Sequence, residues 1–473
     1  MDSRTNILFI LSDQHNARVL GAAGDATVRT PHLDRLANDG VLFERAYCQN
    51  PLCCPSRASL LRGQHSKSTG IYTNTDILEP NSTTLPRVLS SHGYRTCLIG
   101  KSHFNGEQFH GYQERPYGDL YGQAHQPDPR RTPQNGASGL GSLVGNAGPT
   151  GIPLPLTQTE ICVAEAAKWL QTHVALRRGQ PFCLSVNFDK PHFPVRCPAA
   201  YFERYDGRVG APKTPPGYRG TAVPFVQKAI DRFGYADEDH DRYMAAYYGC
   251  IEWVDDAVGR LLQTLEYLGL ADDTLVVYTS DHGDLCGEKG AWNKTLFFDS
   301  STRVPLIMRC PSRFAGGRRH AGLAGLIDLF PTFCEVSGAP IPPSCEGSSL
   351  LPLLDAGEAA PDRDLFCESA FLGEPEAAGC MLRRGRWKYT YYLDGAEELY
   401  DMEEDPGEWD NLAADPARRR EAADLRRAVT DFWRPEEHQG RLAATPRTGR
   451  EKHFYEFSNQ FVLAGGAVAD ARP

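Results

Sequence analysis

The sequence lacks any long hydrophobic run. The first apolar stretch, residues 6–11 in MDSRTNILFILSDQ, ends after six residues at Ser12 and Asp13. It is too short for the hydrophobic region of a secretory signal, and it leads into an acid rather than a small-residue cleavage site. No other stretch approaches the length that spans a membrane. We therefore expect a protein that is neither exported nor embedded in a membrane.

Positive charge is also scarce. The 473 residues include 50 Lys and Arg against 60 Asp and Glu, which gives a formal net charge of -10. Because nucleic-acid-binding proteins concentrate Lys and Arg, this balance argues against general nucleic-acid binding. An anionic small substrate stays open, since a few cations in a cleft can outweigh the mean field of the protein.

Cysteine is present, but not in the spacing of a metal finger. None of the 14 cysteines forms a Cys-x2-Cys pair, and the chain has no internal repeat or low-complexity tract. Disulfides persist in oxidising compartments, so without an export signal we expect reduced thiols and a cytoplasmic enzyme. The length suits one large domain with a substantial core and a smaller one.

Four short apolar runs each end in a cluster of polar residues. The runs are residues 6–11, 96–100, 182–188 and 274–279, and the clusters are Ser12-Asp13-Gln14, Lys101-Ser102-His103, Asp189-Lys190-Pro191-His192 and Ser280-Asp281-His282-Gly283-Asp284. Each run is apolar at consecutive positions, which is typical of strands buried between two helical layers.

Helical patterns lie between these runs. Thr157 and Glu160 have the spacing of a capping box, which predicts a helix through Leu170, and residues 241–268 carry apolar residues at helical spacing. Alternating strands and helices predict an α/β layered sheet. Ligands of such sheets bind beyond the carboxyl ends of the strands, where the four polar clusters fall. Together the clusters indicate a functional site.

We expect two domains. Residues 1–375 would form a catalytic α/β domain, in which residues 104–156, rich in Gly, Pro, Gln and Asn, form a functional insertion or lid. Residues 376–473 would form a smaller α+β subdomain with an antiparallel sheet and a helix.

The smaller subdomain has its own sequence pattern. Residues 380–402 alternate like antiparallel strands joined at Asp394-Gly395, and a charged helical pattern follows around 416–433. The aromatic segment 451–461 is expected to pack across the body or onto a neighbouring subunit, which makes a homo-oligomer our expectation.

The segment NPLCCPSRASLLRG, residues 50–63, holds adjacent cysteines at a predicted helix start. Pro55 suits the first helical turn and Gly63 suits the helix end. Cys53 would then lie at the helix N-terminus, where the dipole stabilises negative charge. We interpret Cys54 as a buried thiol.

This segment resembles the Cys-x-Pro-Ser-Arg signature of type I sulfatases, in the alkaline phosphatase superfamily. The resemblance is strongest to choline-sulfatase-like and bacterial arylsulfatases, and it extends over most of the chain. It includes TPHLDRLANDGVLFERAYC (30–48), GYRTCLIGKSHF (93–104), PHFP (191–194), SDHGDLCGEKGAWNKTLFFDSSTRVPLIM (280–308) and GRWKYTYYLDGAEELYDMEEDPGEWDNL (385–412). It implies an alkaline-phosphatase-like mixed sheet sandwiched by helices, with a smaller C-terminal α+β subdomain.

The resemblance also implies a metal site. A divalent cation would be held by Asp13, Gln14, Cys53, Asp281 and His282, with Cys53 converted to formylglycine. Oxygen ligands favour Ca2+, and the histidine also accommodates Mn2+. Many sulfatases carry two consecutive acids at the first strand end, whereas this chain has Ser12-Asp13-Gln14, so the site carries fewer formal charges.

The implied reaction is covalent catalysis by an activated nucleophile at position 53. His192 and Lys294 match the positions that protonate or stabilise the leaving oxygen, and His103 matches the one that accepts the proton when sulfate is expelled. In the same resemblance, Arg57 would hold the formylglycine and the metal ligands in place, and Lys101 and Lys294 would stabilise the negative charge of the reacting group. Asn74 would contact the sulfate. Four polar neighbours we interpret as structural groups or as supports that hold the site residues from behind: Asp189, Lys190, Asp284 and Glu288.

The predicted function is hydrolysis of aryl or small alkyl sulfate monoesters, after maturation by a formylglycine-generating enzyme. The alternative within the superfamily is a phosphonate monoester hydrolase or phosphodiesterase. Those enzymes resemble this family but carry Tyr and Thr where this chain has Lys101 and His103, which favours sulfate. A third hypothesis is a non-enzymatic anion-binding protein in which Cys53 is never converted.

Overall fold

The computed structural model describes residues 4–74, 76–104, 109–118, 147–210, 212–215, 218, 220–221, 223–224, 226–227, 237–355, 363–370, 378–437, 460–462 and 468–470. Within these residues, no helix combines the length and the apolar character needed to cross a membrane.

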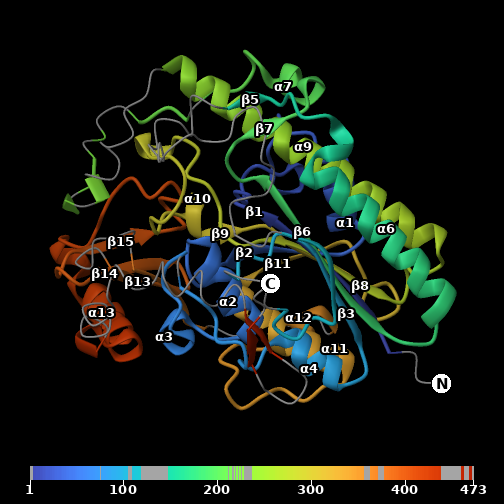
Figure 1. Ribbon diagram of the computed structural model, residues 1–473. Helices are drawn as coiled ribbons and strands as arrows, with labels where there is room; N and C mark the ends of the chain where they lie inside the picture. The colour runs from blue at the N-terminus through green and yellow to red at the C-terminus, as the bar shows by residue number, and fades with distance from the viewer. Residues whose placement is uncertain are drawn as a thin grey trace.

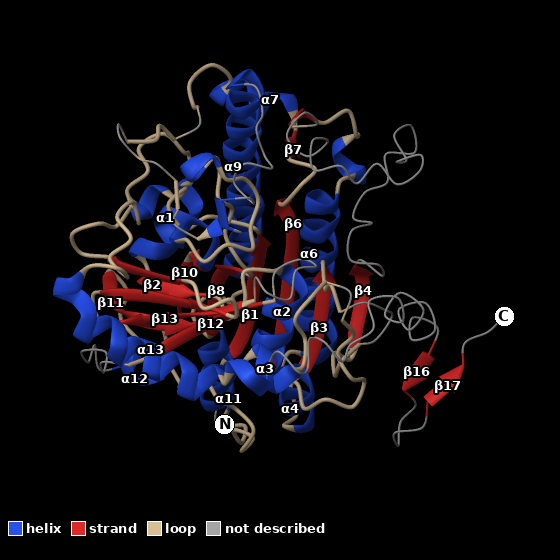
Figure 2. Cartoon of the chain, turned by 90° about the vertical axis from the view of Figure 1, so that its left-hand side faces the viewer, coloured by secondary structure: helices blue, strands red, loops and turns tan. Residues whose placement is uncertain are grey.

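A central mixed sheet forms the body of the protein (Figure 2). In pairing order, its strands are β11 (Arg318–Gly325), β2 (Val41–Tyr47), β10 (Leu306–Arg309), β8 (Thr274–Ser280), β1 (Asn6–Asp13), β6 (Phe182–Pro191), β3 (Arg95–Gly100) and β4 (Glu114–Gly118), with β9 (Arg303–Val304) beside β2. Strands β1, β3, β4, β6 and β8 run parallel, whereas β10 is antiparallel to β8 and β2. The four apolar runs of the sequence are therefore four central, parallel strands, as predicted.

Helices cover both faces of this sheet (Figure 1). On β1, Leu8 and Ile10 pack in a core with α1 (Pro31–Asn38), α6 (Gln158–Arg177) and α9 (Asp237–Tyr267). Its alternate residues Ile7, Phe9 and Leu11 pack on the other side with α4 (Leu85–Ser91) and α11 (Leu329–Ser337). Each such buried side chain contributes about 1.5–3 kcal/mol, which explains why both faces of the strand are apolar.

Shorter elements connect these layers. They are η1 (Gly21–Ala23), α2 (Cys53–Arg62), α3 (Ser66–Thr69), β5 (Gly148–Pro149), η2 (Leu154–Leu156), β7 (Arg196–Cys197), α7 (Ala199–Tyr205), η3 (Glu288–Gly290), α10 (Asp299–Thr302), η4 (Leu326–Asp328), α12 (Leu351–Asp355) and η6 (Pro416–Arg418).

A second, four-stranded antiparallel sheet lies towards the C-terminal end of the chain, at the left of Figure 1. Its strands are β12 (Leu365–Ser369), β13 (Gly379–Arg384), β14 (Trp387–Tyr392) and β15 (Glu397–Asp401), and α13 (Arg419–Trp433) packs against it. The predicted small sheet and helix are confirmed. Strand β12 precedes residue 376, so the sheet takes its first strand from the segment that the sequence assigned to the catalytic domain.

The predicted capping box does not form, although α6 begins where it was expected. The Thr157 hydroxyl donates to the carbonyl oxygen of Leu154 at 2.6 Å instead of capping the helix. The Glu160 carboxylate accepts from Arg260 and Trp253 of α9. A charged partner on the neighbouring helix therefore outcompetes the local cap.

Two segments singled out in the sequence are described only in part. Within 104–156, β4 forms the edge of the main sheet and β5 pairs with β7, while residues 105–108 and 119–146 lie outside the described residues. Within 451–461, only Gln460 and Phe461 are described, in β16 (Gln460–Val462), which pairs with β17 (Val468–Asp470). A lid and a packed aromatic tail stay predictions.

Candidate functional site

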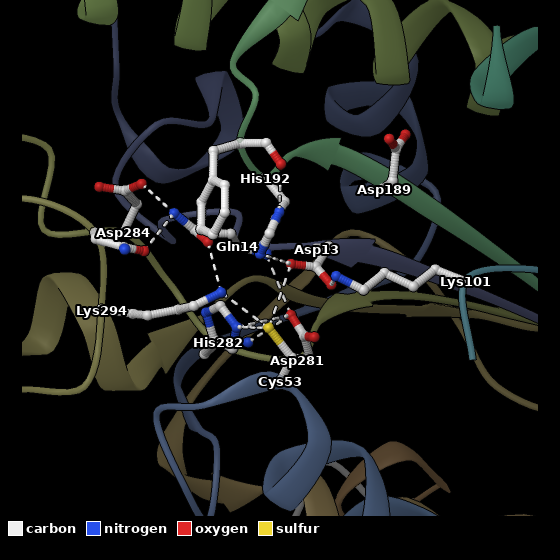
Figure 3. Close-up of polar contacts among 12 residues, drawn as sticks. Asp13, Gln14, Cys53, Lys101, Asp189, His192, Asp281, His282, Asp284 and Lys294 are labelled. Atoms are coloured by element: carbon white, nitrogen blue, oxygen red, sulfur yellow. Dashed lines mark hydrogen bonds and ion pairs between the residues drawn. The ribbon is translucent and has the colours of Figure 1, made fainter. Parts of the chain in front are cut away.

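The carboxyl ends of the parallel strands meet at one edge of the main sheet. Ser12 of β1 is in register with Ser280 of β8, and Asp13 is opposite Pro191 of β6. The polar residues that follow these strands converge on Cys53 (Figure 3): Asp13, Lys101, His192 and Asp281. The fold thus brings together side chains that the sequence spreads over about 270 positions.

Helix α2 places Cys53 at this edge. The helix begins at Cys53, has Pro55 in its first turn and ends before Gly63, whose φ of 63° is in the left-handed region. A Cβ at Gly63 would lie 2.9 Å from the Cβ of Phe330, so glycine is also required by close packing. The N-terminus of α2, with the positive end of the helix dipole, therefore lies at the site.

The Cys53 thiol is fully buried among charged groups. Its Sγ lies 2.9 Å from Nζ of Lys294, 3.1 Å from Nε2 of His282 and 3.9 Å from Oδ1 of Asp13. Asp13, His282 and Lys294 thus meet at Cys53, as Figure 3 shows.

Four residues at this point could hold a cation. One ligand atom from each of Asp13, Cys53, Asp281 and His282 lies within 4.8 Å of the other three. Nδ1 of His282 is hydrogen-bonded to the carbonyl oxygen of Gly283 at 2.9 Å, which makes Nδ1 the protonated nitrogen and leaves the Nε2 lone pair facing the group. Two carboxylates and an imidazole suit a divalent cation, so the residues present fit a metal.

Arg57 bridges the carboxylates of Asp13 and Asp281. Its Nη2 lies 2.7 Å from Oδ2 of Asp13, and its Nε lies 2.7 Å from Oδ2 of Asp281. The guanidinium thereby takes the outer oxygen of each carboxylate, and the Oδ1 atoms are left on the side of Cys53 and His282. A fully buried arginine with two acid partners fixes ligand geometry before any ligand arrives.

The charges around Cys53 shift the pKa values of the site. Burial alone would raise the pKa of Asp13, but the cations Lys101 and Arg57 hold that pKa well below its usual range. Burial and Asp13 would likewise raise the pKa of Cys53, yet Lys294 and Lys101 lower it well below the ordinary thiol value. The position is therefore built to stabilise a negative charge.

The family model of sulfatases matches residues 5–339 of this chain. The chain belongs to the sulfatase family. This sulfatase is a sulfuric ester hydrolase of the alkaline phosphatase superfamily, and the resemblance seen in the sequence is confirmed. A second family model, N-sulphoglucosamine sulphohydrolase C-terminal, matches residues 287–434 and so includes the small sheet and α13.

A curated relative agrees with this assignment, and solved structures share the fold. The sulfatase is 31% identical to the choline-sulfatase of Rhizobium meliloti (strain 1021), over 87% of this chain and 83% of that protein. It superposes with a TM-score of 0.76 on BT4656 in complex with its substrate D-glucosamine-2-N,6-O-disulfate, at 21% identity, over 92% of this chain and 98% of that chain. The phosphonate monoester hydrolase SpPMH from Silicibacter pomeroyi gives a TM-score of 0.74 at 26% identity, over 99% of each chain.

The sulfatase positions the other predicted residues around this centre in different ways. Nζ of Lys101 is fully buried 2.7 Å from Oδ2 of Asp13, so it acts on the carboxylate directly. The Asn74 side-chain oxygen accepts the N–H of Cys54 at 3.0 Å, which places its amide beside the start of α2. His103 is buried just beyond β3 with a φ of 53°, and its part in proton transfer stays a prediction.

His192 faces the centre as a neutral ring. Burial, Lys101 and Lys294 together lower the pKa of His192 to about 3. Its Nδ1 is hydrogen-bonded to the carbonyl oxygen of Phe193 at 2.6 Å, so Nδ1 carries the proton and Nε2 is an acceptor, 3.9 Å from Oδ1 of Asp13. A role of His192 as proton donor therefore needs a bound anion that raises its pKa.

The residues interpreted as structural divide into two groups. Asp189 pairs with Lys190 at 3.0 Å and stands apart from Cys53 in Figure 3, and Glu288 pairs with Arg18 at 2.8 Å. Asp284, in contrast, is joined to Gln14 of the site. Tyr243 of α9, which the sequence did not single out, donates to Asp284 at 2.5 Å. Tyr243 and Asp284 are 41 residues apart in the chain, and the packing of α9 brings them together.

Proposed function

We propose that this sulfatase hydrolyses aryl or small alkyl sulfate monoesters with a formylglycine at position 53 and a divalent cation, Ca2+ in preference to Mn2+. The carrying observation is the placement of the Cys53 thiol within the group of ligand atoms from Asp13, Asp281 and His282. Gln14, the remaining ligand that the resemblance implies, lies next to this group: its Oε1 accepts at 2.8 Å from Lys294, whose Nζ is 2.9 Å from Sγ of Cys53.

When bound, the cation and the aldehyde hydrate would supply a nucleophilic oxygen and polarise the sulfuryl oxygens. The chain itself supplies charge and position. Lys294 donates to the atom at position 53 and faces charge that spreads onto the sulfuryl group, while Lys101 and Arg57 keep Asp13 ionised. An anionic ester bound beside His192 would raise the pKa of that ring, so that it can protonate the leaving oxygen.

Two measurements test this proposal. Mass spectrometry of the tryptic peptide that contains residue 53, from a host able to convert the cysteine, is expected to give the mass of the aldehyde. Steady-state rates on an aryl sulfate are expected to exceed those on the matched aryl phosphonate. An unmodified thiol with no turnover would instead support an anion-binding protein.

The adjacent thiol provides a matched control. Cys53→Ala should abolish turnover without unfolding the protein, because Cys53 is a chemical group rather than a core contact. Cys54→Ala should retain turnover, since its Sγ is directed to the carbonyl oxygen of Asp76, at 3.5 Å, and Cys54 is not one of the four residues that could hold the cation. Equal losses in both variants would contradict a special role of position 53.

Phosphonate monoester hydrolysis is the second candidate. The likeness to the Silicibacter pomeroyi hydrolase, over 99% of each chain, favours it. The clustered cations Lys101 and Lys294 suit any tetrahedral anion, so activity on both ester classes is expected. The ratio of kcat/KM on the two aryl esters ranks the candidates.

We further propose a cytoplasmic location and maturation by a formylglycine-generating enzyme. All 14 cysteines are free thiols, which is the usual state in a reducing compartment. Fractionation of the native host followed by immunodetection tests the location, and co-expression with and without the converting enzyme tests the maturation. A homo-oligomer is proposed on the sequence alone and is tested by light scattering.

A further inference from the structure

A continuous chain of buried polar side chains leads from Tyr243 of α9 to residue 53, and Figure 3 shows the part of it from Asp284 to Cys53. The Tyr243 hydroxyl donates to Oδ2 of Asp284 at 2.5 Å, and Nε2 of Gln14 donates to the same oxygen at 2.5 Å. Oε1 of Gln14 accepts from Nζ of Lys294 at 2.8 Å, and this ammonium lies 2.9 Å from Sγ of Cys53. All five side chains are buried.

The two neighbours of Gln14 determine which way its amide points. A carboxylate such as Asp284 only accepts hydrogen bonds, and the ammonium of Lys294 only donates them. The amide therefore turns its nitrogen to Asp284 and its oxygen to Lys294. Asn293 supports this orientation, because its Oδ1 is a second acceptor for Nε2, at 3.2 Å. In the reversed orientation, the amide oxygen would face the Asp284 carboxylate, so that two acceptors meet, and the NH2 group would face the Lys294 ammonium, so that two donors meet.

Asp284 is itself held in place independently of Gln14. Its Oδ1 accepts the backbone N–H of Cys286 at 2.7 Å, and Oδ2 accepts from Tyr243. Two donors on separate elements thus fix the carboxylate before it orients the amide.

We propose that Asp284 is a positioning residue of the sulfatase reaction: it orients the Gln14 amide so that the amide oxygen holds Lys294 against residue 53. The inference rests on the proposed function, since Lys294 acts there on the reacting group. If an amide that donates a hydrogen bond replaces this carboxylate, the Gln14 amide can rotate by about 180°. It would then present its NH2 group to Lys294 and displace the ammonium.

A double-mutant cycle tests this role. Asp284→Asn retains the size of the side chain and an oxygen for the N–H of Cys286, and it should lower kcat/KM on an aryl sulfate about 10- to 100-fold. Gln14→Glu alone should also be impaired, because it places two carboxylates together. The double variant should have a higher kcat/KM than either single variant. Its carboxylate at position 14 can accept from the amide at position 284 and offer its other oxygen to Lys294.

A binding measurement accompanies the rates. The dissociation constant of inorganic sulfate, from titration calorimetry of metal-loaded protein, should rise about 10-fold in Asp284→Asn and recover in the combination. Rates are divided by the fraction of aldehyde at position 53 in each preparation. If wild type shows neither aldehyde nor turnover, the proposed function fails, while coupling in sulfate binding between positions 14 and 284 still supports the orienting role.

Controls separate orientation from general disruption. Asp189→Asn removes another buried carboxylate, which is bonded to Lys190 and stands apart from Cys53, so its combination with Gln14→Glu should be additive. If Asp284→Asn does not fold, Tyr243→Phe removes one of the two supports and should lower kcat/KM about 2- to 10-fold. Wild-type kinetics in the folded variant, or simple additivity between positions 14 and 284, would overturn the proposal.

Discussion

The ammonium of Lys388 lies 2.8 Å from Oδ1 of Asp299, and both side chains are buried. Lys388 lies on β14 of the small sheet, and Asp299 begins α10, five residues after Lys294 of the site. Glu408 completes the cluster: its Oε1 is 2.6 Å from Lys388, and its Oε2 accepts the N–H of Asp299 at 2.7 Å. The small sheet is thus joined to the segment that carries a site lysine.

Lys388→Met should lower the free energy of unfolding by about 3–5 kcal/mol, because it leaves two buried carboxylates without their common cation. Urea unfolding followed by fluorescence measures the change. Arg384→Met, four residues away, is the matched control: Arg384 pairs with Asp364, the two side chains are 36% and 31% exposed, and the loss of this pair should have little effect. Comparable losses in the two variants would contradict the importance of burial.

Two lysines of one segment should separate activity from stability. Lys294→Met removes the ammonium beside Cys53, so kcat/KM on an aryl sulfate should fall about 10²- to 10³-fold, as for loss of one preorganised donor. Lys289→Met removes an ammonium that lies 3.6 Å from the centroid of the Trp409 ring and donates to Gly407, so it should lower the melting temperature instead. Steady-state kinetics and thermal melts on both variants check this division.

The sequence predicted the parts of the fold that depend on local patterns. Strands β1, β3, β6 and β8 were recognisable because strands buried on both faces are apolar at consecutive positions. Helix α2 was recognisable because Pro55 and Gly63 have positional meaning. Once these strands are parallel, their polar ends must meet at one edge, so Asp13 and Asp281 could be brought together without coordinates.

Contacts between distant elements could not be predicted in this way. Tyr243 contacts Asp284 only because α9 packs across the sheet, and no local pattern distinguishes it from other tyrosines of α9. The capping box failed for the same reason, since Arg260 is a partner for Glu160 that only the fold supplies. Strand β12 was not assigned to the small sheet from the sequence, because nine residues separate Ser369 of β12 from Gly379, its partner in β13.

The buried Glu368 should make stability depend on pH. Burial raises the pKa of Glu368 to about 8, although the N–H of Lys67 donates to its carboxylate. The folded protein then keeps a proton that the unfolded chain releases near pH 4.5. The contribution of this proton to the free energy of unfolding is therefore complete below pH 4.5 and is lost as the pH rises through 8. Glu368→Gln mimics the protonated acid and should remove that loss.

The comparison of this variant with wild type isolates the effect of Glu368 from that of other acids. The free energies of unfolding should be similar at about pH 5, and the variant should gain about 1.4 kcal/mol per pH unit between about pH 5 and 8. Urea titrations at several pH values measure both. A difference that stays constant with pH would show that Glu368 is ionised in the folded protein.

Cation binding should stabilise the protein through Asp13 and Asp281. A ligand that binds only the folded state at about 100 times its Kd adds about 2.7 kcal/mol, so Ca2+ should raise the melting temperature by a few degrees and a chelator should reverse the rise. Asp281→Asn should abolish most of this shift, because it weakens one of the two carboxylate ligands.

Asp256→Asn is the control: Asp256 belongs to a second, partly exposed acidic group, and its carboxylate accepts from Tyr201 at 2.6 Å. A shift that survives Asp281→Asn but disappears with Asp256→Asn would place the cation elsewhere, and a larger shift with Mn2+ than with Ca2+ would reverse the proposed choice of metal.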